Sequence, residues 1–111
     1  MGMEWVRKYC LSFPGTTENV QWGSDLVFKV AGKMFAVTNL EPSKLCLSFK
    51  SSDEDFATLT ERPGVVPAPY LARAHWVALE SERAIPASEL KPLLRNAYDL
   101  IVAKLPKSKR P

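Results

Sequence analysis

An amphipathic stretch at residues 88–105 places the strongest constraint on how this chain can fold. Its apolar residues advance by alternating steps of three and one, which on a helix gives a stripe about 100° wide: Leu90, Leu93, Leu94, Ala97, Tyr98, Ile101, Val102 and Leu105. A helix with such a stripe has to bury it against a second layer of structure. We therefore expect this helix to lie on a sheet, with Ser88 as its N-cap.

The middle of the chain carries strand patterns. Residues 26–30 and 34–38 are apolar runs on either side of a turn in which Gly32 permits the positive φ of a hairpin. Apolar side chains alternate through residues 44–50, which is the period-two pattern of a strand with one buried face. We expect a further strand at residues 74–79 and a short edge strand at residues 18–22.

Two shorter helices complete the pattern. Residues 3–12 carry an apolar stripe that Pro14-Gly15 ends, and Ser51-x-x-Glu54 matches a capping box for a helix that starts at Ser51 or Ser52. Residues 65–71 contain two prolines, so we expect an ordered loop or a tight turn there. The order is helix, three or four antiparallel strands, helix, strand, helix. It predicts an α+β fold, a two-layer sandwich with helices packed on one face of an antiparallel sheet.

The length of 111 residues gives room for one core, which we place in residues 1–105, followed by a basic tail at residues 106–111. Of 15 basic residues, four lie near the end with no acid among them, and without these four the chain has 11 basic against 12 acidic residues: Lys104, Lys107, Lys109 and Arg110. This balance permits binding to a polyanion without requiring it. No run approaches the ~20 apolar residues of a membrane span, and the N-terminus lacks a signal-peptide pattern, so we expect a cytoplasmic monomer.

No pattern typical of catalysis or metal binding is present. Cys10 and Cys46 stand apart among apolar neighbours, so we predict free thiols in a reducing compartment. With one histidine in the chain, a zinc site of four ligands would need distant carboxylates. The GxSxG, GxGxxG and P-loop motifs are absent. We therefore expect no enzyme activity, no metal and no cofactor.

Four lysines between residues 26 and 52, against one acid, form the first candidate site: Lys29, Lys33, Lys44 and Lys50. If the strands pair as expected, Lys29, Lys44 and Lys50 project from the open face of the sheet, and Lys33 lies at a turn. Such a patch can neutralise a few phosphates of a nucleic acid. The alternative is that exposed strands carry lysine to prevent edge pairing and to stay soluble.

Residues 73–76 are the second candidate. Arg73 and His75 can contact phosphate, and Trp76 can stack on an unpaired base. Because neighbouring residues of a strand point to opposite faces, only one of His75 and Trp76 can belong to the core. We expect Trp76 to serve mainly in packing and His75 to be a hydrogen-bonded structural residue.

A ligand cleft near Trp22, Tyr70 and Trp76 is the third candidate. The uncharged, proline-stiffened loop around Tyr70 either lines such a cleft or plugs the end of the sheet. Trp22 is either a lid on the core or an exposed stacking platform. The sequence leaves both alternatives open.

Four segments, taken together and in this order, resemble the MmcQ/YjbR-like family over nearly the whole chain. They are Phe13-Pro14-Gly15 before Trp22-Gly23, residues 28–36, residues 67–71 before His75-Trp76-Val77, and residues 97–102 with Lys104-Leu105-Pro106. The resemblance implies a fold similar to type III secretion chaperones and frataxin, and a DNA-binding role through two hairpin wings. We therefore expect a protein that contacts the nucleic-acid backbone. The alternative is a non-enzymatic adaptor that binds a protein partner or a small ligand.

Overall fold

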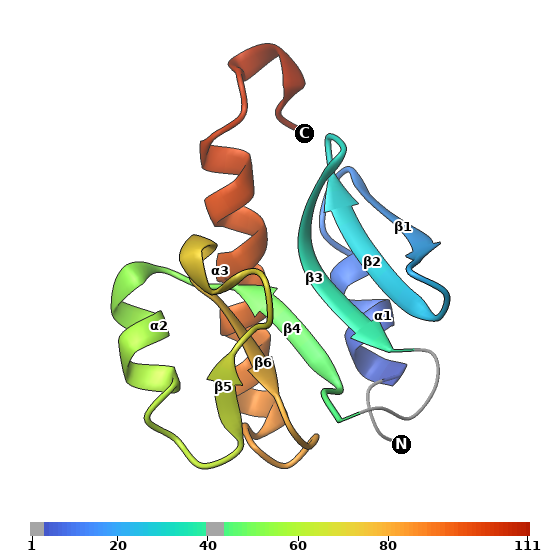
Figure 1. Cartoon of the computed structure of the whole chain (residues 1–111). Helices are drawn as coiled ribbons and strands as arrows, with labels where there is room; N and C mark the ends of the chain where they lie inside the picture. The colour runs from blue at the N-terminus through green and yellow to red at the C-terminus, as the bar shows by residue number, and fades with distance from the viewer. Residues whose placement is uncertain (1–3, 40–43) are drawn as a thin grey trace.

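Six antiparallel strands form one sheet in the order β1-β2-β3-β4-β6-β5. The computed structural model describes residues 4–39 and 44–111 (Figure 1). The strands are β1 (Thr16–Gln21), β2 (Asp25–Val30), β3 (Lys33–Asn39), β4 (Leu47–Lys50), β5 (Val65–Pro67) and β6 (Trp76–Leu79). The helices are α1 (Glu4–Leu11), α2 (Asp53–Leu59) and α3 (Ala87–Ala103), and two short 3₁₀ turns are η1 (Ala72–Ala74) and η2 (Lys107–Lys109).

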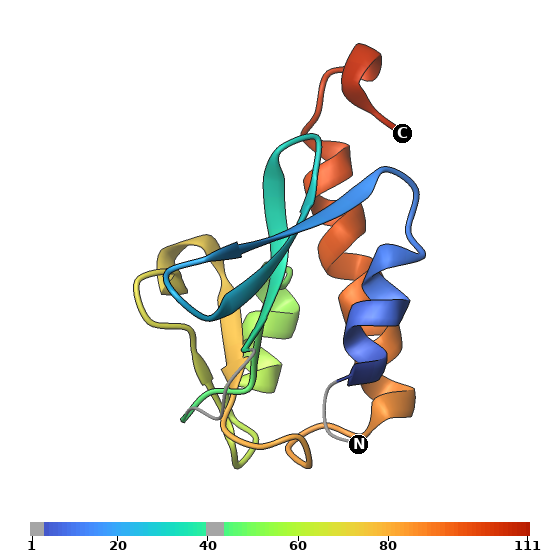
Figure 2. The same cartoon turned by 90° about the vertical axis from the view of Figure 1, so that its right-hand side faces the viewer.

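Helices α1 and α3 lie side by side on one face of the sheet (Figure 2). Helix α2 packs beside β5 and β6 at one edge. The core between the layers is filled by large side chains such as Phe28, Phe35 and Phe49 from the sheet, with Leu90 and Leu94 from α3. The predicted α+β fold, with an antiparallel sheet covered by helices on one face, is confirmed.

The apolar stripe of α3 faces the sheet as predicted. Leu90, Leu94, Ala97 and Tyr98 are buried, and the Tyr98 hydroxyl donates a hydrogen bond to the Pro14 carbonyl. The helix begins at Ala87 rather than after Ser88. Pro86 takes the N-cap position, where its extended backbone (φ −61°, ψ 150°) leads into the first turn without a side-chain cap.

The strand predicted over residues 44–50 is β4 and begins only at Leu47, and the edge strand predicted over residues 18–22 is β1, at residues 16–21. Two larger differences from the prediction lie at the other edge of the sheet. Residues 65–67 were expected in a loop, but they form β5, which pairs with β6 at the edge of the sheet. Pro67 is tolerated there because an edge strand has one side without ladder partners. The strand expected from residue 74 begins at Trp76, because residues 72–74 form η1 and His75 follows with φ 61°.

Residues in turns and helix caps explain where β2, β3 and α2 begin and end. Ala31 and Gly32 join β2 to β3 with φ values of 52° and 79°, as a two-residue hairpin turn of type I′ requires. The N-cap of α2 is Ser52, whose Oγ accepts the Asp55 amide at 3.1 Å. The capping box predicted from Ser51 is therefore wrong by one residue, because the Ser51 hydroxyl donates to the His75 carbonyl at 2.6 Å.

Cys10 lies fully buried on α1, and both cysteines are free thiols. Burial raises the pKa of the Cys10 thiol to about 12 from its ordinary value of 9.0. An unfolded chain loses this proton near pH 9, whereas the folded protein keeps it. The contribution of Cys10 to stability is therefore present below pH 9 and is lost as the pH rises above it.

We expect this linkage to reduce the free energy of unfolding by about 1.4 kcal/mol between pH 8 and pH 10. Urea denaturation at both pH values measures it. A Cys10→Ala variant should be less stable at pH 8, because a buried side chain is shortened, but its stability should fall less toward pH 10. If both proteins lose the same free energy, the pH dependence arises elsewhere.

Candidate binding surfaces

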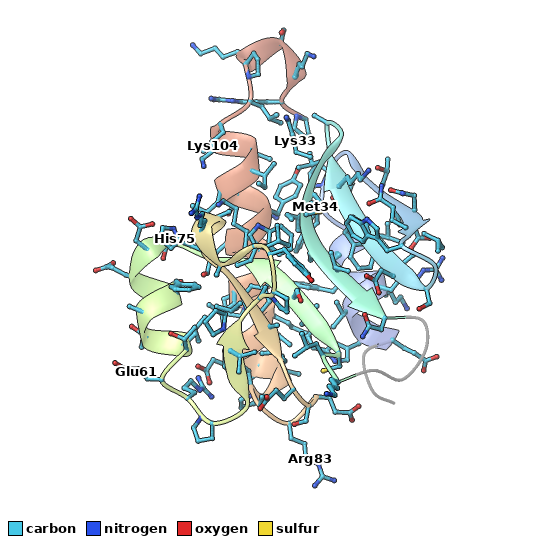
Figure 3. All side chains as sticks on the ribbon, viewed as in Figure 1. Lys33, Met34, Glu61, His75, Arg83 and Lys104 are labelled. Carbon is cyan, nitrogen blue, oxygen red and sulfur yellow. The ribbon has the colours of Figure 1, made fainter. Side chains whose placement is uncertain are left out.

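The four candidate lysines do not form one surface. Lys33 is exposed at the β2–β3 turn, and Lys29 is half-buried nearby on β2, opposite Met34. Lys44 is exposed before β4, near the other end of β3. With a rise of about 3.3 Å per residue, the seven residues of β3 separate its ends by roughly 20 Å. Lys44 therefore belongs to a different part of the surface from Lys33 (Figures 1 and 3).

Lys50 is not available for contact with phosphate. Its side chain is buried at 9% exposure, and its Nζ donates to the Ala74 carbonyl at 2.8 Å. Burial lowers the pKa of Lys50, and the nearby positive charge of Lys104 lowers it further. The prediction that Lys50 projects from an open face is wrong because the segment around η1 folds over the end of β4.

His75 forms the C-cap of η1. The prediction that His75 and Trp76 alternate in one strand is therefore wrong, because β6 begins at Trp76. The Nδ1 of His75 lies 2.9 Å from Oδ1 of Asp53, and its ring packs edge-on against Phe56 with centroids 5.2 Å apart. This fits the hydrogen-bonded structural role that we expected. Figure 3 labels His75 at this position. Arg73, two residues before His75 in the chain, is exposed on η1.

The face of the sheet opposite α1 and α3 carries a second, smaller apolar cluster, which we call the outer cluster. Its buried members are Val27, Val37, Ala68, Trp76 and Ala78. Residues 68–74 fold across this face, so it is not the open, lysine-bearing surface that the strand pattern predicted. Trp76 is 3% exposed and serves in packing, as expected.

A cleft of about 590 Å³ lies over the outer cluster. Its lining comes from the β1–β2 turn, strands β2 to β4 and the loop after β5: Trp22, Asp25, Met34, Val37, Asn39, Leu45, Ser48, Ala68, Pro69, Tyr70 and Leu71. Its volume falls in the range of small-molecule sites, and its lining is mainly apolar, as such sites usually are. Two of the three residues predicted for a ligand cleft, Trp22 and Tyr70, line it, whereas Trp76 belongs to the cluster beneath.

Trp22 and Tyr70 stand exposed in this cleft. Trp22 is 67% exposed and Tyr70 is fully exposed, so Trp22 is a platform rather than a lid on the core. Both have positive φ, 51° and 66°, which is uncommon for residues with side chains. For Trp22 the turn itself accounts for this value, because Trp22 and Gly23 (φ 87°) lie in the short turn between β1 and β2, as Ala31 and Gly32 lie between β2 and β3. The cleft is therefore bordered by two large aromatic side chains that the fold leaves exposed.

Sequence reasoning missed Asp25, the one charged residue among the described residues that line the cleft. Within residues 4–39 and 44–111, no cation lies within ion-pair distance of its carboxylate. The alternation of side chains between the two faces of β2 is the sequence pattern that could have indicated Asp25. Asp25 shares a face with Val27 of the outer cluster, while Leu26 and Phe28 point into the main core.

The C-terminal residues are exposed but are not a free tail. The Arg110 guanidinium donates to the carbonyls of Leu105 (3.0 Å) and Ala103 (3.2 Å), which lie at the end of α3. The ring of Pro111 approaches Gly15 so closely that a Cβ on Gly15 would lie 3.0 Å from it. These contacts hold the segment near the β2–β3 turn (Figures 1 and 2).

The folded tail, the end of α3 and the β2–β3 turn lie at one end of the molecule (Figure 1). They carry five exposed cations, which we call the basic end: Lys33, Lys104, Lys107, Lys109 and Arg110. Figure 3 shows Lys33 and Lys104 at the same end of the molecule, below the tail. The ion pairs found across the described part of the chain use other cations, namely Arg7, Arg62, His75 and Arg95. The charges of the basic end are therefore not neutralised by neighbouring carboxylates.

Two kinds of feature are absent from the described residues, a cluster of metal ligands and a membrane-spanning helix. No group of three or more His, Cys, Asp or Glu side chains is arranged to hold a metal ion. No helix is long and apolar enough to cross a bilayer.

Comparison with known proteins identifies relatives over most of the chain. The family model described as YjbR matches residues 11–100. The proteins named "Uncharacterized protein YjbR" from Escherichia coli K12 and O157:H7 are each 28% identical over 106 residues, covering 93% of this chain and 89% of theirs. A crystal structure of a protein from Pseudomonas syringae, a structural-genomics target, superposes with a TM-score of 0.71 at 19% identity, over 90% of this chain and 98% of that one. At that identity the likeness shows the fold alone.

Proposed function

Because this chain belongs to the YjbR family, we propose the role that the family resemblance implies, contact with the nucleic-acid backbone, and we assign it to the basic end. The observation that carries the proposal is the set of five exposed cations on adjoining elements, none of which forms an ion pair within the described part of the chain. We propose a binding protein without enzyme activity that acts as a monomer in the cytoplasm.

The distribution of charge supports this assignment. The chain has 15 basic and 12 acidic residues, so the five cations of the basic end leave ten basic against twelve acidic residues elsewhere. A chain of net charge +3 therefore carries its excess positive charge at one end. A concentrated patch steers a polyanion toward one orientation, whereas the same charges scattered over the surface would not.

The proposed contacts are to phosphate rather than to bases. These five cations lie at a turn, at the C-terminal end of α3 and in or beside a 3₁₀ turn, so they do not form a basic helix face that could enter a groove. Phosphate contacts fix a protein on a duplex but carry no direct sequence information. We therefore expect little preference between duplex sequences.

A fluorescence-anisotropy titration with duplex DNA at about 50 mM and about 200 mM salt tests the proposal. Each neutralised phosphate contributes about 0.9 to the slope of log affinity against log salt, so five contacts give a slope of up to about 4.5 and a loss of up to roughly 500-fold between these concentrations. Removing residues 106–111 should lower the slope to about 1.8, because Lys33 and Lys104 remain. No change in anisotropy at low salt would remove the proposal.

Truncation also removes the contacts of Arg110 and Pro111, so a second variant separates charge from structure. Lys107→Gln with Lys109→Gln keeps both contacts and removes two charges. We expect its slope to fall by about 1.8. If only the truncated protein loses binding, the folded position of the tail matters more than its charge.

The cleft over the outer cluster favours a second candidate function, the binding of a small ligand. Its volume suits a small molecule better than a protein surface, and two of its aromatic side chains are largely exposed. Ligand entry should change the fluorescence of Trp22. A flat response across a metabolite panel, with Trp22→Phe as the background, would count against this function.

A further inference from the structure

The chemistry of the cleft indicates which class of small molecule it takes. We propose that it binds a small organic cation with an apolar body, such as an amine or a quaternary ammonium compound. This inference rests on the second proposed function, that the cleft binds a ligand at all. It is independent of the basic end, none of whose residues lines the cleft.

Charge complementarity is the first argument. Asp25 brings a negative charge to a mainly apolar lining, and within the described part of the chain no lysine, arginine or histidine pairs with it or lines the cleft. The residue is half-buried, so its charge is less screened than that of a fully exposed carboxylate. A cation that enters the cleft therefore meets an unpaired opposite charge.

The aromatic residues supply the second argument. Trp22 and Tyr70 present exposed rings, and the faces of such rings attract ammonium groups through their quadrupole. The thioether of Met34, also in the lining, is polarisable and adapts to irregular ligand shapes. Aromatic side chains gathered around a site are the means by which proteins recognise quaternary ammonium groups.

The same lining disfavours the obvious competitor, a nucleotide. A base would stack on Trp22 or Tyr70. The phosphate of the nucleotide would then lie near the Asp25 carboxylate, and the described lining residues include no cation to neutralise it. The basic end, which could neutralise a phosphate, belongs to the β2–β3 turn and the C-terminus instead. The apolar floor formed by residues such as Val37 and Leu71 matches a hydrocarbon or aromatic body.

A matched pair of ligands tests the proposal on the unmodified protein. Benzyltrimethylammonium and neopentylbenzene have nearly the same shape and differ in charge. Titration of ¹⁵N-labelled protein, followed by the indole N–H signal of Trp22 (assigned with Trp22→Phe), should show the cation binding about tenfold more tightly than its neutral isostere. Equal affinity for the two would overturn the cationic class while leaving the cleft as a ligand site. No binding of either would overturn this inference and the second proposed function together.

Variants then assign the discrimination to Asp25. Asp25→Asn keeps the size of the side chain, and we expect it to weaken the cation about tenfold while leaving the neutral ligand unchanged. Glu80→Gln, at an exposed carboxylate outside the cleft, is the matched control and should alter neither affinity. Preference for the cation that persists in Asp25→Asn would show that the aromatic rings alone provide it.

Discussion

Reversing three charges of the basic end, with Lys33→Glu, Lys104→Glu and Lys107→Glu together, is expected to weaken binding to duplex DNA about 100-fold at low salt. Each lost contact accounts for about 1 kcal/mol, and the new carboxylates add repulsion. Because three of five cations are removed, the slope of log affinity against log salt should fall by about 2.7. Anisotropy titrations over a series of salt concentrations measure both quantities.

The control for this experiment carries the same total charge. Lys8→Glu, Lys44→Glu and Arg83→Glu change exposed residues away from the basic end, and both triple variants shift the net charge from +3 to −3. Figure 3 shows Arg83 at the opposite end of the molecule from Lys33. We expect the control to lose less than tenfold in affinity. Equal losses would mean that net charge, and not the basic end, governs binding.

Lys44 gives this comparison a second use. The strand pattern placed it on the predicted nucleic-acid surface, with Lys29, Lys33 and Lys50. If Lys44→Glu alone weakens binding as much as Lys33→Glu alone, contact extends along the whole β2–β3 hairpin and the basic end is too narrow a definition of the site.

Replacing Trp76 by alanine is expected to lower the free energy of unfolding by about 3–5 kcal/mol. The side chain is nearly fully buried in the outer cluster, so the substitution removes a large apolar surface and leaves a cavity. A domain of this size has a total stability of about 5–15 kcal/mol, so the variant will be close to unfolding at ordinary temperature. Urea denaturation followed by circular dichroism measures the change.

Trp22→Ala is the matched comparison, since it makes the same substitution at an exposed position. We expect it to change stability by less than about 0.5 kcal/mol, because Trp22 makes little contact with the core. The pair also tests the stacking role that sequence analysis considered for Trp76. A Trp76→Ala protein that keeps its stability but no longer binds DNA would contradict a packing role.

The parts of the fold that the sequence predicts well depend on local signals. The stripe of α3 and the two-residue turn at Ala31-Gly32 specify their own structure within a few residues. Strand β5 escaped prediction because Pro67 is acceptable only at a sheet edge, and that edge exists only once β6 is in place. The burial of Lys50 likewise depends on a carbonyl 24 residues away in η1.

The candidate sites also combine features that local sequence predicts with features that depend on contacts between distant residues. Trp22 precedes a glycine and Tyr70 follows a proline, so the sequence alone identifies both as aromatic residues in turns or loops. Their meeting in one cleft depends on the whole sheet, because the β1–β2 turn carries Trp22 and the loop after β5 carries Tyr70. Asp25 joins them as the first residue of β2. The basic end depends on a contact between Pro111 and Gly15, which no local pattern encodes.

That contact has a practical meaning for anyone who prepares the protein. Residues appended after Pro111, such as a hexahistidine purification handle, would emerge against the turn that contains Gly15 and near the β2–β3 turn (Figure 1). A handle in this place could mask the cations or, as imidazoles gain protons in mildly acidic buffer, imitate them. Affinity measurements on such material would report the handle together with the protein, so a removable one is needed.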